Sequence, residues 1–421
     1  MRVLLVNAFH WLKGGVERTY FDESRWLTAA GHDVAHFATA DARNEPSPTA
    51  AWFAPHADFG EGAPLLAQLG ALPHAMWSAP AADAMAALLT QFRPDVAHLH
   101  APSRYLTPSI LAPLERAGVP VVMTLHDFKP WCTNRLLYAH GEICERCRGG
   151  HHWHAVQTGC VQGSRLKSAI GAVEAYLHDH WRAYASVRRW VAPSQWVYDK
   201  ALTFGADPAR MRVLSHGVEL ASADGGAGLP PNLPARYALF AGRLAVEKGV
   251  QLLPAIARAI APEALVVCGD GPLAGWLDAQ ALPNIRRVGR VNDATLAAIR
   301  ARASVVLAPS TFVEHFGYSV AEALLDAKPV VAARIGALPE LVEHEVTGLL
   351  ATPGNGEELG AMAKRALTDP AATSWGLAGR ERVKRVGDPA VHLAGLLAVY
   401  DEAVAATSAS RTPTRRGRAP A

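Results

Sequence analysis

Residues 237–249 read Tyr-Ala-Leu-Phe-Ala-Gly-Arg-Leu-Ala-Val-Glu-Lys-Gly, and they contain the repeating unit of the fold. A short apolar run ends at Gly242, a loop carries Arg243 and Lys248, and an apolar-periodic segment starts at Val250. This order predicts a buried strand, a turn and a helix.

The same unit recurs on both sides of this stretch. Short apolar runs alternate with segments of helical periodicity, which is typical of the βαβ rhythm of doubly wound parallel sheets. The sequence therefore predicts an α/β fold. Strands are expected at residues 2–7, 34–38, 96–100, 120–125 and 190–192, and in the second half at 237–241, 304–308, 329–333 and 348–351.

Glycine and proline interrupt this rhythm at residues 221–234, which predicts a domain boundary there. We expect an N-terminal domain at 1–220, with an insertion at 131–162, and a second domain at 235–387. A last helix is expected at 388–405. Residues 406–421 are small, polar and basic without an apolar period, so we expect a disordered tail.

The overall charge of +3 comes from the end of the chain. Four of the 41 Lys and Arg residues follow Glu402, which leaves 37 basic against 38 acidic residues elsewhere. This balance argues against nucleic acid as a partner. The apolar start is too short for a signal peptide, and we find no run of ~18 uninterrupted apolar residues. We expect a cytoplasmic protein, with the inner face of the plasma membrane as the alternative location.

Residues 314–322 read Glu-His-Phe-Gly-Tyr-Ser-Val-Ala-Glu and follow the apolar run 304–308. Helical spacing from Tyr318 onward places Gly317 at a helix start, Glu314 on the loop and Glu322 within the helix. A helix start favours a phosphate, and carboxylates favour hydroxyls, so the segment suits a nucleotide sugar. The alternative for Glu322 is a solvated helix face.

Several short motifs occur in an order and spacing that strongly resemble glycosyltransferase family 4. They are Gly14-Gly15-Val16-Glu17-Arg18, Leu125-His126-Asp127, Gly242-Arg243 with Glu247-Lys248-Gly249, Gly269-Asp270-Gly271-Pro272, and Glu314 with Glu322. The resemblance implies the GT-B architecture, in which two Rossmann-like domains face a cleft and the last helix crosses back to the first domain. It also implies a retaining transfer of a sugar from a nucleotide diphosphate.

The resemblance assigns a donor site to the second domain. It implies that Arg243 and Lys248 hold the diphosphate, Gly317 and Tyr318 offer backbone N–H groups, Glu322 binds the ribose and Glu314 contacts the sugar. The alternative for the two cations is a surface ion pair with Glu247. The remaining predicted donor-binding residues are Gly14, Gly15, Gly269, Gly271, Arg290, Val291 and Phe316.

The resemblance implies that His126 also reaches the donor sugar, which makes His126 and Glu314 the predicted catalytic residues. A structural histidine is the alternative, and His98 and His100 compete for the acceptor side. No Asp-x-Asp pair suggests a catalytic divalent metal, and no carboxylate of the first domain stands out as a covalent nucleophile.

We therefore expect a retaining glycosyltransferase of cell-surface polysaccharide or glycoconjugate assembly, acting on a glycan or lipid-linked acceptor. Two alternatives stay open. One is a GT-B sugar-nucleotide epimerase, and the other is a zinc-stabilised binding protein without catalysis. The chain lacks G-x-G-x-x-G after its first strand, which weakens an oxidoreductase interpretation.

Four of the five cysteines fall in the insertion: Cys132, Cys144, Cys147 and Cys160. The two-residue spacing between Cys144 and Cys147 is typical of metal ligands, and a reducing cytosol favours zinc over two disulfides. We expect a zinc here to be structural and no cofactor to be required for catalysis.

Residues 166–184 carry apolar side chains at helical spacing among several arginines. This pattern predicts an amphipathic helix, and packing on the sheet is the favoured interpretation. The alternative is a peripheral membrane contact.

Overall fold

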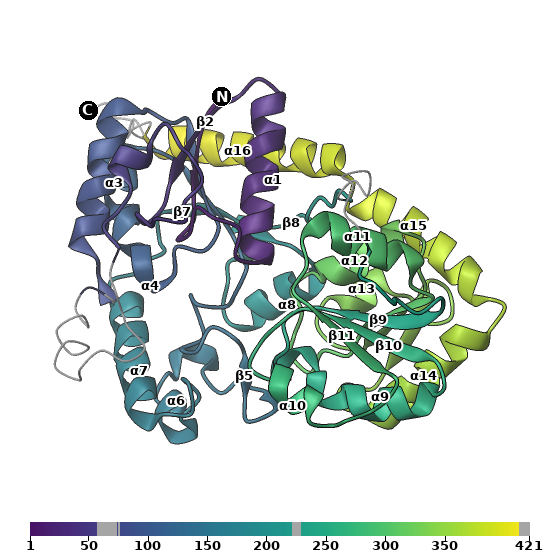
Figure 1. Ribbon diagram of the computed structural model, residues 1–421. Coiled ribbons are helices and arrows are strands. Elements are labelled where there is room, and N and C mark those ends of the chain that lie inside the picture. Colours follow the sequence, from purple (N-terminus) through teal and green to yellow (C-terminus); the bar gives the residue numbers. More distant parts are fainter. Residues whose placement is uncertain (57–73, 75, 221–228, 412–421) are drawn as a thin grey trace, which may run out of the picture.

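The computed structural model of the chain describes residues 1–56, 74, 76–220 and 229–411, and it contains two parallel six-stranded sheets (Figure 1). In the first sheet the order is β2-β1-β3-β4-β7-β8, and in the second it is β11-β10-β9-β12-β13-β14. The first sheet comprises β1 (Arg2–Val6), β2 (Asp33–Phe37), β3 (Val96–Leu99), β4 (Val121–Thr124), β7 (Val187–Ala192) and β8 (Met211–Val213). The second comprises β9 (Tyr237–Ala241), β10 (Ala264–Cys268), β11 (Ile285–Gly289), β12 (Val305–Ala308), β13 (Val330–Ala333) and β14 (Gly348–Ala351).

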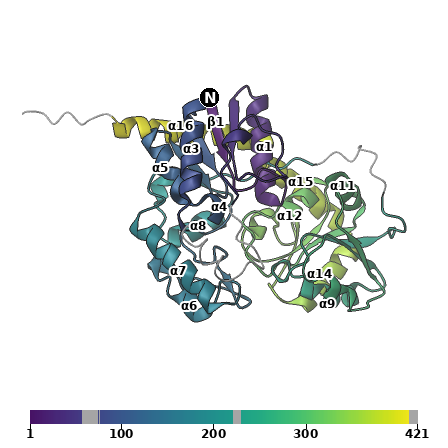
Figure 2. The same cartoon turned by 60° about the vertical axis from the view of Figure 1, so that its left-hand side comes forward.

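Helices cover both faces of each sheet (Figures 1 and 2). The first domain has α1 (Gly15–Ala29), α3 (Ala79–Gln91), α4 (Ser103–Leu106), α5 (Leu111–Arg116), α6 (His154–Thr158), α7 (Arg165–His180) and α8 (Gln195–Thr203). The second has α9 (Leu253–Ile260), α10 (Ala274–Asp278), α11 (Asp293–Arg302), α12 (Tyr318–Leu325), α13 (Leu338–Leu341), α14 (Gly356–Thr368) and α15 (Ala372–Val386), and α16 (Pro389–Arg411) ends the described chain.

Side chains of one strand alternate between two cores. Val3 and Leu5 of β1 pack into the core on one face, whereas Leu4 and Val6 pack into the core on the other. All four are fully buried, because a parallel sheet covered on both faces needs apolar residues at every position. The predicted doubly wound α/β fold is confirmed.

The strand order of each sheet reverses at one place. In the first sheet this switch lies between β1 and β3, and in the second it lies between β9 and β12. The loops that leave the carboxyl ends of two such neighbours diverge to opposite faces, and ligands of open α/β sheets bind in the crevice between them. The segments after β9 and β12 contain Lys248 and Glu314, so the topology brings these two residues together.

Helix α16 follows the second domain but packs on the first sheet. Its residues Leu396 and Tyr400 are fully buried in a core that they share with Tyr20 of α1. The helix continues to Arg411, so residues 406–411 are helical and the expectation of disorder from Ala406 is wrong there; 412–421 lie outside the described residues. By length and composition alone the helical stretch Ala372–Ser408 could cross a membrane, a criterion that buried core helices also meet.

The insertion and α7 form a separate lobe below the first sheet (Figure 1). A hairpin of β5 (Tyr138–Ala139) and β6 (Glu142–Ile143) precedes α6, and α7 packs on α6 and on Thr133. The apolar side chains of α7 do not pack on the sheet as favoured from the sequence. Leu166 is 62% exposed, and the buried residues of α7 are Ser168, Gly171, Ala172 and His178 instead.

Candidate active site

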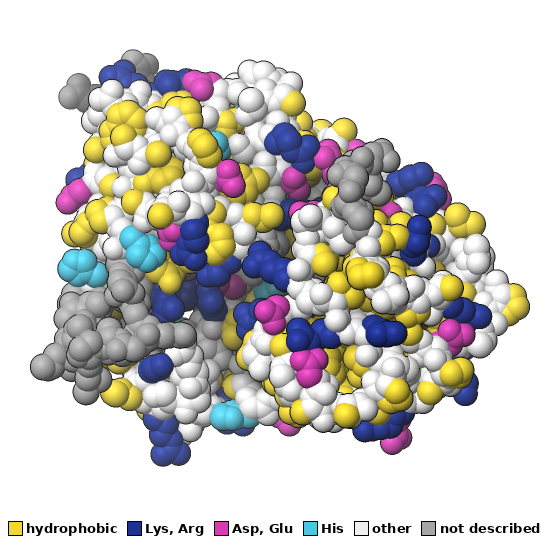
Figure 3. Space-filling model, viewed as in Figure 1, with side chains coloured by type: hydrophobic (Ala, Val, Ile, Leu, Met, Phe, Trp, Pro, Cys, Tyr) yellow, Lys and Arg dark blue, Asp and Glu magenta, His cyan; other side chains and the backbone are white. Residues whose placement is uncertain are grey.

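A cavity of about 310 Å³ lies between the two domains. The first domain contributes residues after β1 and β4 and the connection after β8, and the second contributes the segments after β9 and β12. Figure 3 shows Lys and Arg side chains around the hollow between the domains. The lining residues are Gly15, Val16, His126, His216, Phe240, Ala241, Gly242, Lys248, Leu307, Ala308, Pro309, Ser310, Glu314, His315, Phe316, Gly317, Tyr318 and Ser319.

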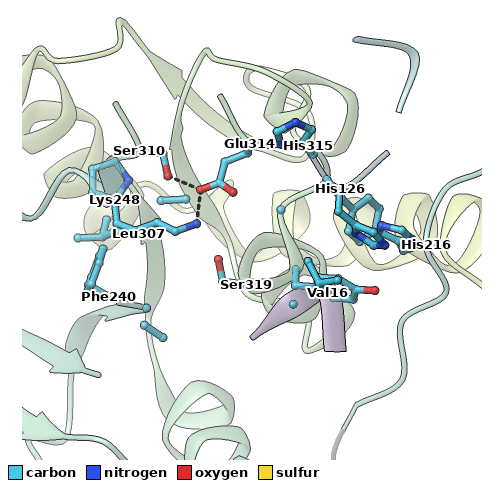
Figure 4. Close-up of a pocket in the computed structure, with 18 residues that line it drawn as sticks. Val16, His126, His216, Phe240, Lys248, Leu307, Ser310, Glu314, His315 and Ser319 are labelled. Carbon is cyan, nitrogen blue, oxygen red and sulfur yellow. Dashed lines mark hydrogen bonds and ion pairs between the residues drawn. The ribbon is translucent and has the colours of Figure 1, made fainter. Parts of the chain in front are cut away.

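The Glu314 carboxylate is held from one side (Figure 4). Lys248 Nζ donates to Glu314 Oε1 at 2.6 Å, and Ser310 Oγ donates to the same oxygen at 2.7 Å. Burial acts to raise the pKa of Glu314, but the charge of Lys248 and the two hydrogen bonds outweigh burial and lower it. Glu314 is therefore an ionised acceptor at neutral pH. The cavity thus contains a fixed carboxylate beside a primary ammonium group.

Helix α12 begins at the cavity wall. Its N-cap Gly317 has φ 100°, and a Cβ there would lie 2.7 Å from Leu338 Cδ2, so the position requires glycine. The first N–H groups of a helix have no partner within the helix and carry about half a positive charge. Tyr318 and Ser319, the first residues of the helix, line the cavity next to Lys248 and offer these donors. The resemblance implied Gly317 and Tyr318 for this role, and a contact of either residue with phosphate stays a prediction.

Histidine rings form the opposite wall of the cavity. His126 stacks on His216 with centroids 5.3 Å apart, and its Nε2 lies 3.1 Å from Nδ1 of His100. Burial, with His216 and His100 as neighbours, holds the pKa of His126 well below its ordinary value. Burial likewise lowers the pKa of His216 to about 3. Neutral imidazoles thus face the cavity, which suits hydrogen bonding to hydroxyls.

A buried carboxylate lies behind these rings. Glu23 Oε2 is 3.3 Å from Nε2 of His100, and Glu23 Oε1 accepts from Nε2 of His392 at 3.1 Å. His392 Nδ1 donates to the carbonyl of Ser215 at 2.7 Å, next to His216. Helix α16 therefore supports the histidine wall from behind.

Four polar residues of the cavity lining were not predicted from the sequence: His216, Ser310, His315 and Ser319. His216 follows β8, a strand of three residues that the apolar pattern did not reveal. His315 and Ser310 flank Glu314 on the predicted loop, so their position after β12 could have identified them.

The predicted glycines differ in their roles. Gly15 lines the cavity and lies against the ring of Tyr318, whereas Gly14 lies outside the lining and has an extended φ of −171°. A Cβ at Gly269 would lie 1.9 Å from the Gly242 carbonyl oxygen, and one at Gly271 would lie 2.6 Å from that of Leu244. These two glycines are required because two loops pack against each other.

Three other predicted donor-binding residues differ in their position relative to the cavity. Phe316 is buried in its wall and packs against Tyr318. Arg290 is exposed and Val291 is partly buried, and neither is part of the lining. Their contacts with a donor stay predictions.

Arg243 and Glu322 already have protein partners. Arg243 is exposed and pairs with Glu247 at 2.7 Å, which is the surface ion pair considered as the alternative for it; Lys248 pairs with Glu314 instead. Glu322 is buried outside the cavity lining, where Arg300 pairs with it at 2.9 Å and Arg18 also contacts it. Diphosphate and ribose binding by these two residues stay predictions.

Two sets of side chains have the chemistry of metal ligands. Among the described residues, Glu23, His98 and His100 are the set of three whose ligand atoms lie within 4.8 Å of one another, and all three are buried. The four cysteines of the insertion are free thiols that line a second, smaller cavity.

Two parallel-sheet domains with a cavity between them, at the carboxyl ends of their strands, form the GT-B architecture. Sequence profiles agree: the profile described as glycosyltransferase family 4 matches residues 13–222, and that of glycosyl transferases group 1 matches residues 235–369. The chain belongs to glycosyltransferase family 4.

Known proteins resemble the chain over different lengths. An uncharacterized glycosyltransferase of Methanocaldococcus jannaschii is 32% identical over 33% of this chain and 36% of its own length, so the match spans about a third of that relative. Sucrose-phosphate synthase from Thermosynechococcus elongatus has the same fold, with a TM-score of 0.70, 21% identity and coverage of 96% of this chain and 99% of that one. Anabaena HepE in complex with UDP and glucose gives a TM-score of 0.65, 18% identity and coverage of 95% and 99%.

Proposed function

We propose that the protein is a retaining glycosyltransferase that moves a sugar from a nucleotide diphosphate to an acceptor hydroxyl. The observation that carries this proposal is the pairing of Glu314 with Lys248 at the switch point of the second sheet. This pair faces the neutral ring of His126 across the cavity. A carboxylate, a cation and an uncharged imidazole in one cleft match a sugar diphosphate, which has hydroxyls at one end and two phosphates at the other.

The donor is oriented by groups of the second domain. Lys248 and the start of α12 face the diphosphate, and they stabilise the negative charge that develops as the phosphate leaves. Glu314 accepts hydrogen bonds from the sugar hydroxyls, and His126 binds the sugar from the first domain. That Anabaena HepE was solved with UDP and glucose supports a nucleotide sugar as the donor class.

Retention of configuration is proposed from membership of the family, and the carboxylates of the cavity bear only on the route by which it occurs. A double displacement needs a nucleophilic carboxylate on the face of the sugar opposite the leaving group. Among the described residues that line the cavity, Glu314 is the only carboxylate, and Lys248 and Ser310 already hold it. The proposal is therefore front-face attack, in which the leaving phosphate takes the proton of the acceptor hydroxyl. Lys248 and α12 neutralise the phosphate, so the proposal includes no divalent cation.

The acceptor is proposed to be a glycan or a lipid-linked sugar used in cell-surface polysaccharide or glycoconjugate assembly. Exposed Val173, Tyr176 and Trp181 of the α7 region support a peripheral contact with a membrane, and Arg165 and Lys167 suit anionic head groups. This contact would place the protein in the cytoplasm at the inner face of the plasma membrane.

Binding of nucleotides tests the donor site directly. The purified full chain is titrated with UDP, GDP, ADP and dTDP and with the corresponding sugar nucleotides, and thermal unfolding is followed. One base is expected to raise the unfolding temperature selectively. Consumption of that sugar nucleotide is then measured with and without acceptor extracts. Turnover that requires an acceptor supports a transferase, whereas turnover without acceptor supports an epimerase. The absence of any nucleotide-dependent shift would contradict the donor site.

A further inference from the structure

The insertion concentrates four of the five cysteines of the chain within 29 residues of one lobe. Cys132 lies between β4 and β5, Cys144 and Cys147 lie at the turn after β6, and Cys160 follows α6. None of them forms a disulfide. The fifth, Cys268, is buried alone at the end of β10 in the other domain.

These four thiols surround one small cavity. Its volume is about 10 Å³, which is room for a single ion or water molecule. His154 also lines it, so five residues with metal-binding atoms border the same cavity although they come from separate parts of the insertion. Scattered core cysteines have no reason to converge in this way.

The lobe has few other means of holding its shape. The strands β5 and β6 have two residues each and α6 has five. Leu137 is fully buried in the core of the first domain, but other large apolar side chains of the lobe are exposed: Leu136 at 40%, Ile143 at 46% and Trp153 at 46%. A segment of this size with so few buried apolar side chains generally needs a cross-link or a metal to be stable.

We propose that the lobe binds one structural zinc ion through Cys132, Cys144, Cys147 and Cys160. Zinc prefers four sulfur or nitrogen ligands in a tetrahedron at about 2.3 Å from each sulfur, and the Cys-x-x-Cys spacing allows two ligands from one turn. No three of these sulfur atoms lie within 4.8 Å of one another in the described chain, so the ion draws the turns together. Four thiolates leave no open coordination position for water, so the ion has no role in the chemistry of transfer.

Neighbouring groups fit metal-bound sulfur. Thr133 Oγ1 lies 3.9 Å from Cys147 Sγ, within reach of a hydrogen bond to sulfur. His152 contacts Thr133 from the other side at 3.4 Å and is held by Asp179 at 2.9 Å. Such outer contacts orient thiolate ligands and are a regular part of structural zinc sites.

The lobe contacts the segment that contains Glu314, so an ion that orders the lobe would also affect the proposed donor site. Tyr138 of the hairpin contacts the ring of Phe312 with centroids 5.7 Å apart, and Phe312 lies two residues before Glu314. Glu145 also pairs with Lys200 of α8. Zinc would therefore fix the hairpin that closes the lower side of the cleft against the Glu314 loop.

Metal analysis of the full chain tests the proposal without any enzyme assay. Protein produced in zinc-containing medium and purified with a reductant is expected to contain about one zinc ion per chain. The double variant Cys144→Ser/Cys147→Ser should lose it, and the matched control Cys268→Ser should retain it. Glu23→Gln separates this site from the buried Glu23, His98 and His100 set, and it should also retain the ion.

The wild-type chain supplies a second readout if a variant fails to fold. Exchange of zinc for cobalt should give the visible absorption of tetrahedral cobalt–thiolate coordination, and chelation should expose residues 131–162 to proteolysis. Protein with four reactive thiols and no zinc would overturn the proposal. A mass four hydrogens lower, from two disulfides, would overturn it as well. Zinc that is lost in Glu23→Gln but kept in the double cysteine variant would assign the ion elsewhere.

Discussion

Replacing Glu314 with glutamine tests the central pair of the cavity. The amide keeps an oxygen that can accept from Lys248 and Ser310, so the local geometry is retained while one negative charge is lost. A hydrogen bond to a charged group contributes about 1.5–3 kcal/mol, and each 1.4 kcal/mol is tenfold. If Glu314 binds the sugar hydroxyls, kcat/KM with the sugar nucleotide should fall by roughly 10- to 150-fold.

Glu314→Gln should affect the binding of the sugar but not that of the diphosphate. Lys248 loses its carboxylate partner in Glu314→Gln and becomes freer to bind phosphate, so calorimetry should show that nucleoside diphosphate binds at least as tightly as before. Glu345→Gln is the matched control, because Glu345 accepts from Arg365 in an exposed pair outside the cavity. Its stability should change by less than about 0.5 kcal/mol. If Glu314→Gln weakened the binding of diphosphate and of sugar nucleotide equally, or if its kcat/KM stayed within threefold of wild type, the proposed role of Glu314 would be refuted.

Three further outcomes follow from the same structure. Lys248→Met should weaken the binding of nucleoside diphosphate and of sugar nucleotide by a similar factor of about 10–100, measured by calorimetry, since it removes a charge-assisted contact to phosphate. Gly317→Ala should lower the free energy of unfolding by about 1–3 kcal/mol more than Gly354→Ala does. Both glycines have a positive φ, but only the methyl group added at Gly317 would contact a side chain, that of Leu338. Denaturant unfolding should show that the free energy of unfolding decreases as the pH falls below about 6.5. Below this pH the histidines of the unfolded chain bind protons, whereas buried histidines with a lowered pKa stay neutral in the folded chain. Each such histidine should lower the stability by up to about 1.4 kcal/mol per pH unit. These histidines, whose pKa is lowered to about 3 or 4, are His10, His36, His98, His216 and His315.

The fold was predictable because buried parallel strands have continuous apolar runs. The runs at 2–7 and 237–241 coincide with β1 and β9 to within a residue. Strand β8 was missed for the converse reason. It has three residues, and Val213 at its end is 44% exposed, so its sequence contains no apolar run.

The site was predictable where the backbone alone decides it. Lys248 and Glu314 meet because β9 and β12 are neighbours, and the N-cap of α12 is Gly317, whose φ of 100° favours glycine. Arg243 and Glu322 were not determined in this way. A long side chain can reach several partners, so its position in the sequence does not determine which one it contacts. The partner of Glu322 in the other domain, Arg18, is distant in sequence.

The histidine wall could not be predicted because it depends on how three distant segments pack. His126 follows β4, His216 belongs to the connection between domains, and Tyr318 lies in the second domain, yet their rings form one stack. A ring contact of this kind leaves no periodic signal in the sequence. The resemblance to the family gave His126, whereas His216 required the structure.

The described domains meet through polar contacts at the cavity and away from it, among them the ion pair of Arg18 with Glu322. Thr19 Oγ1 and the hydroxyl of Tyr318 lie 2.7 Å apart, and the Glu340 carboxylate accepts from the N–H groups of Gln195 and Trp196 at 2.9 and 2.7 Å. Each such hydrogen bond contributes about 0.5–3 kcal/mol, depending on charge. The cavity is complete only when the two domains are in contact, since each domain contributes one wall.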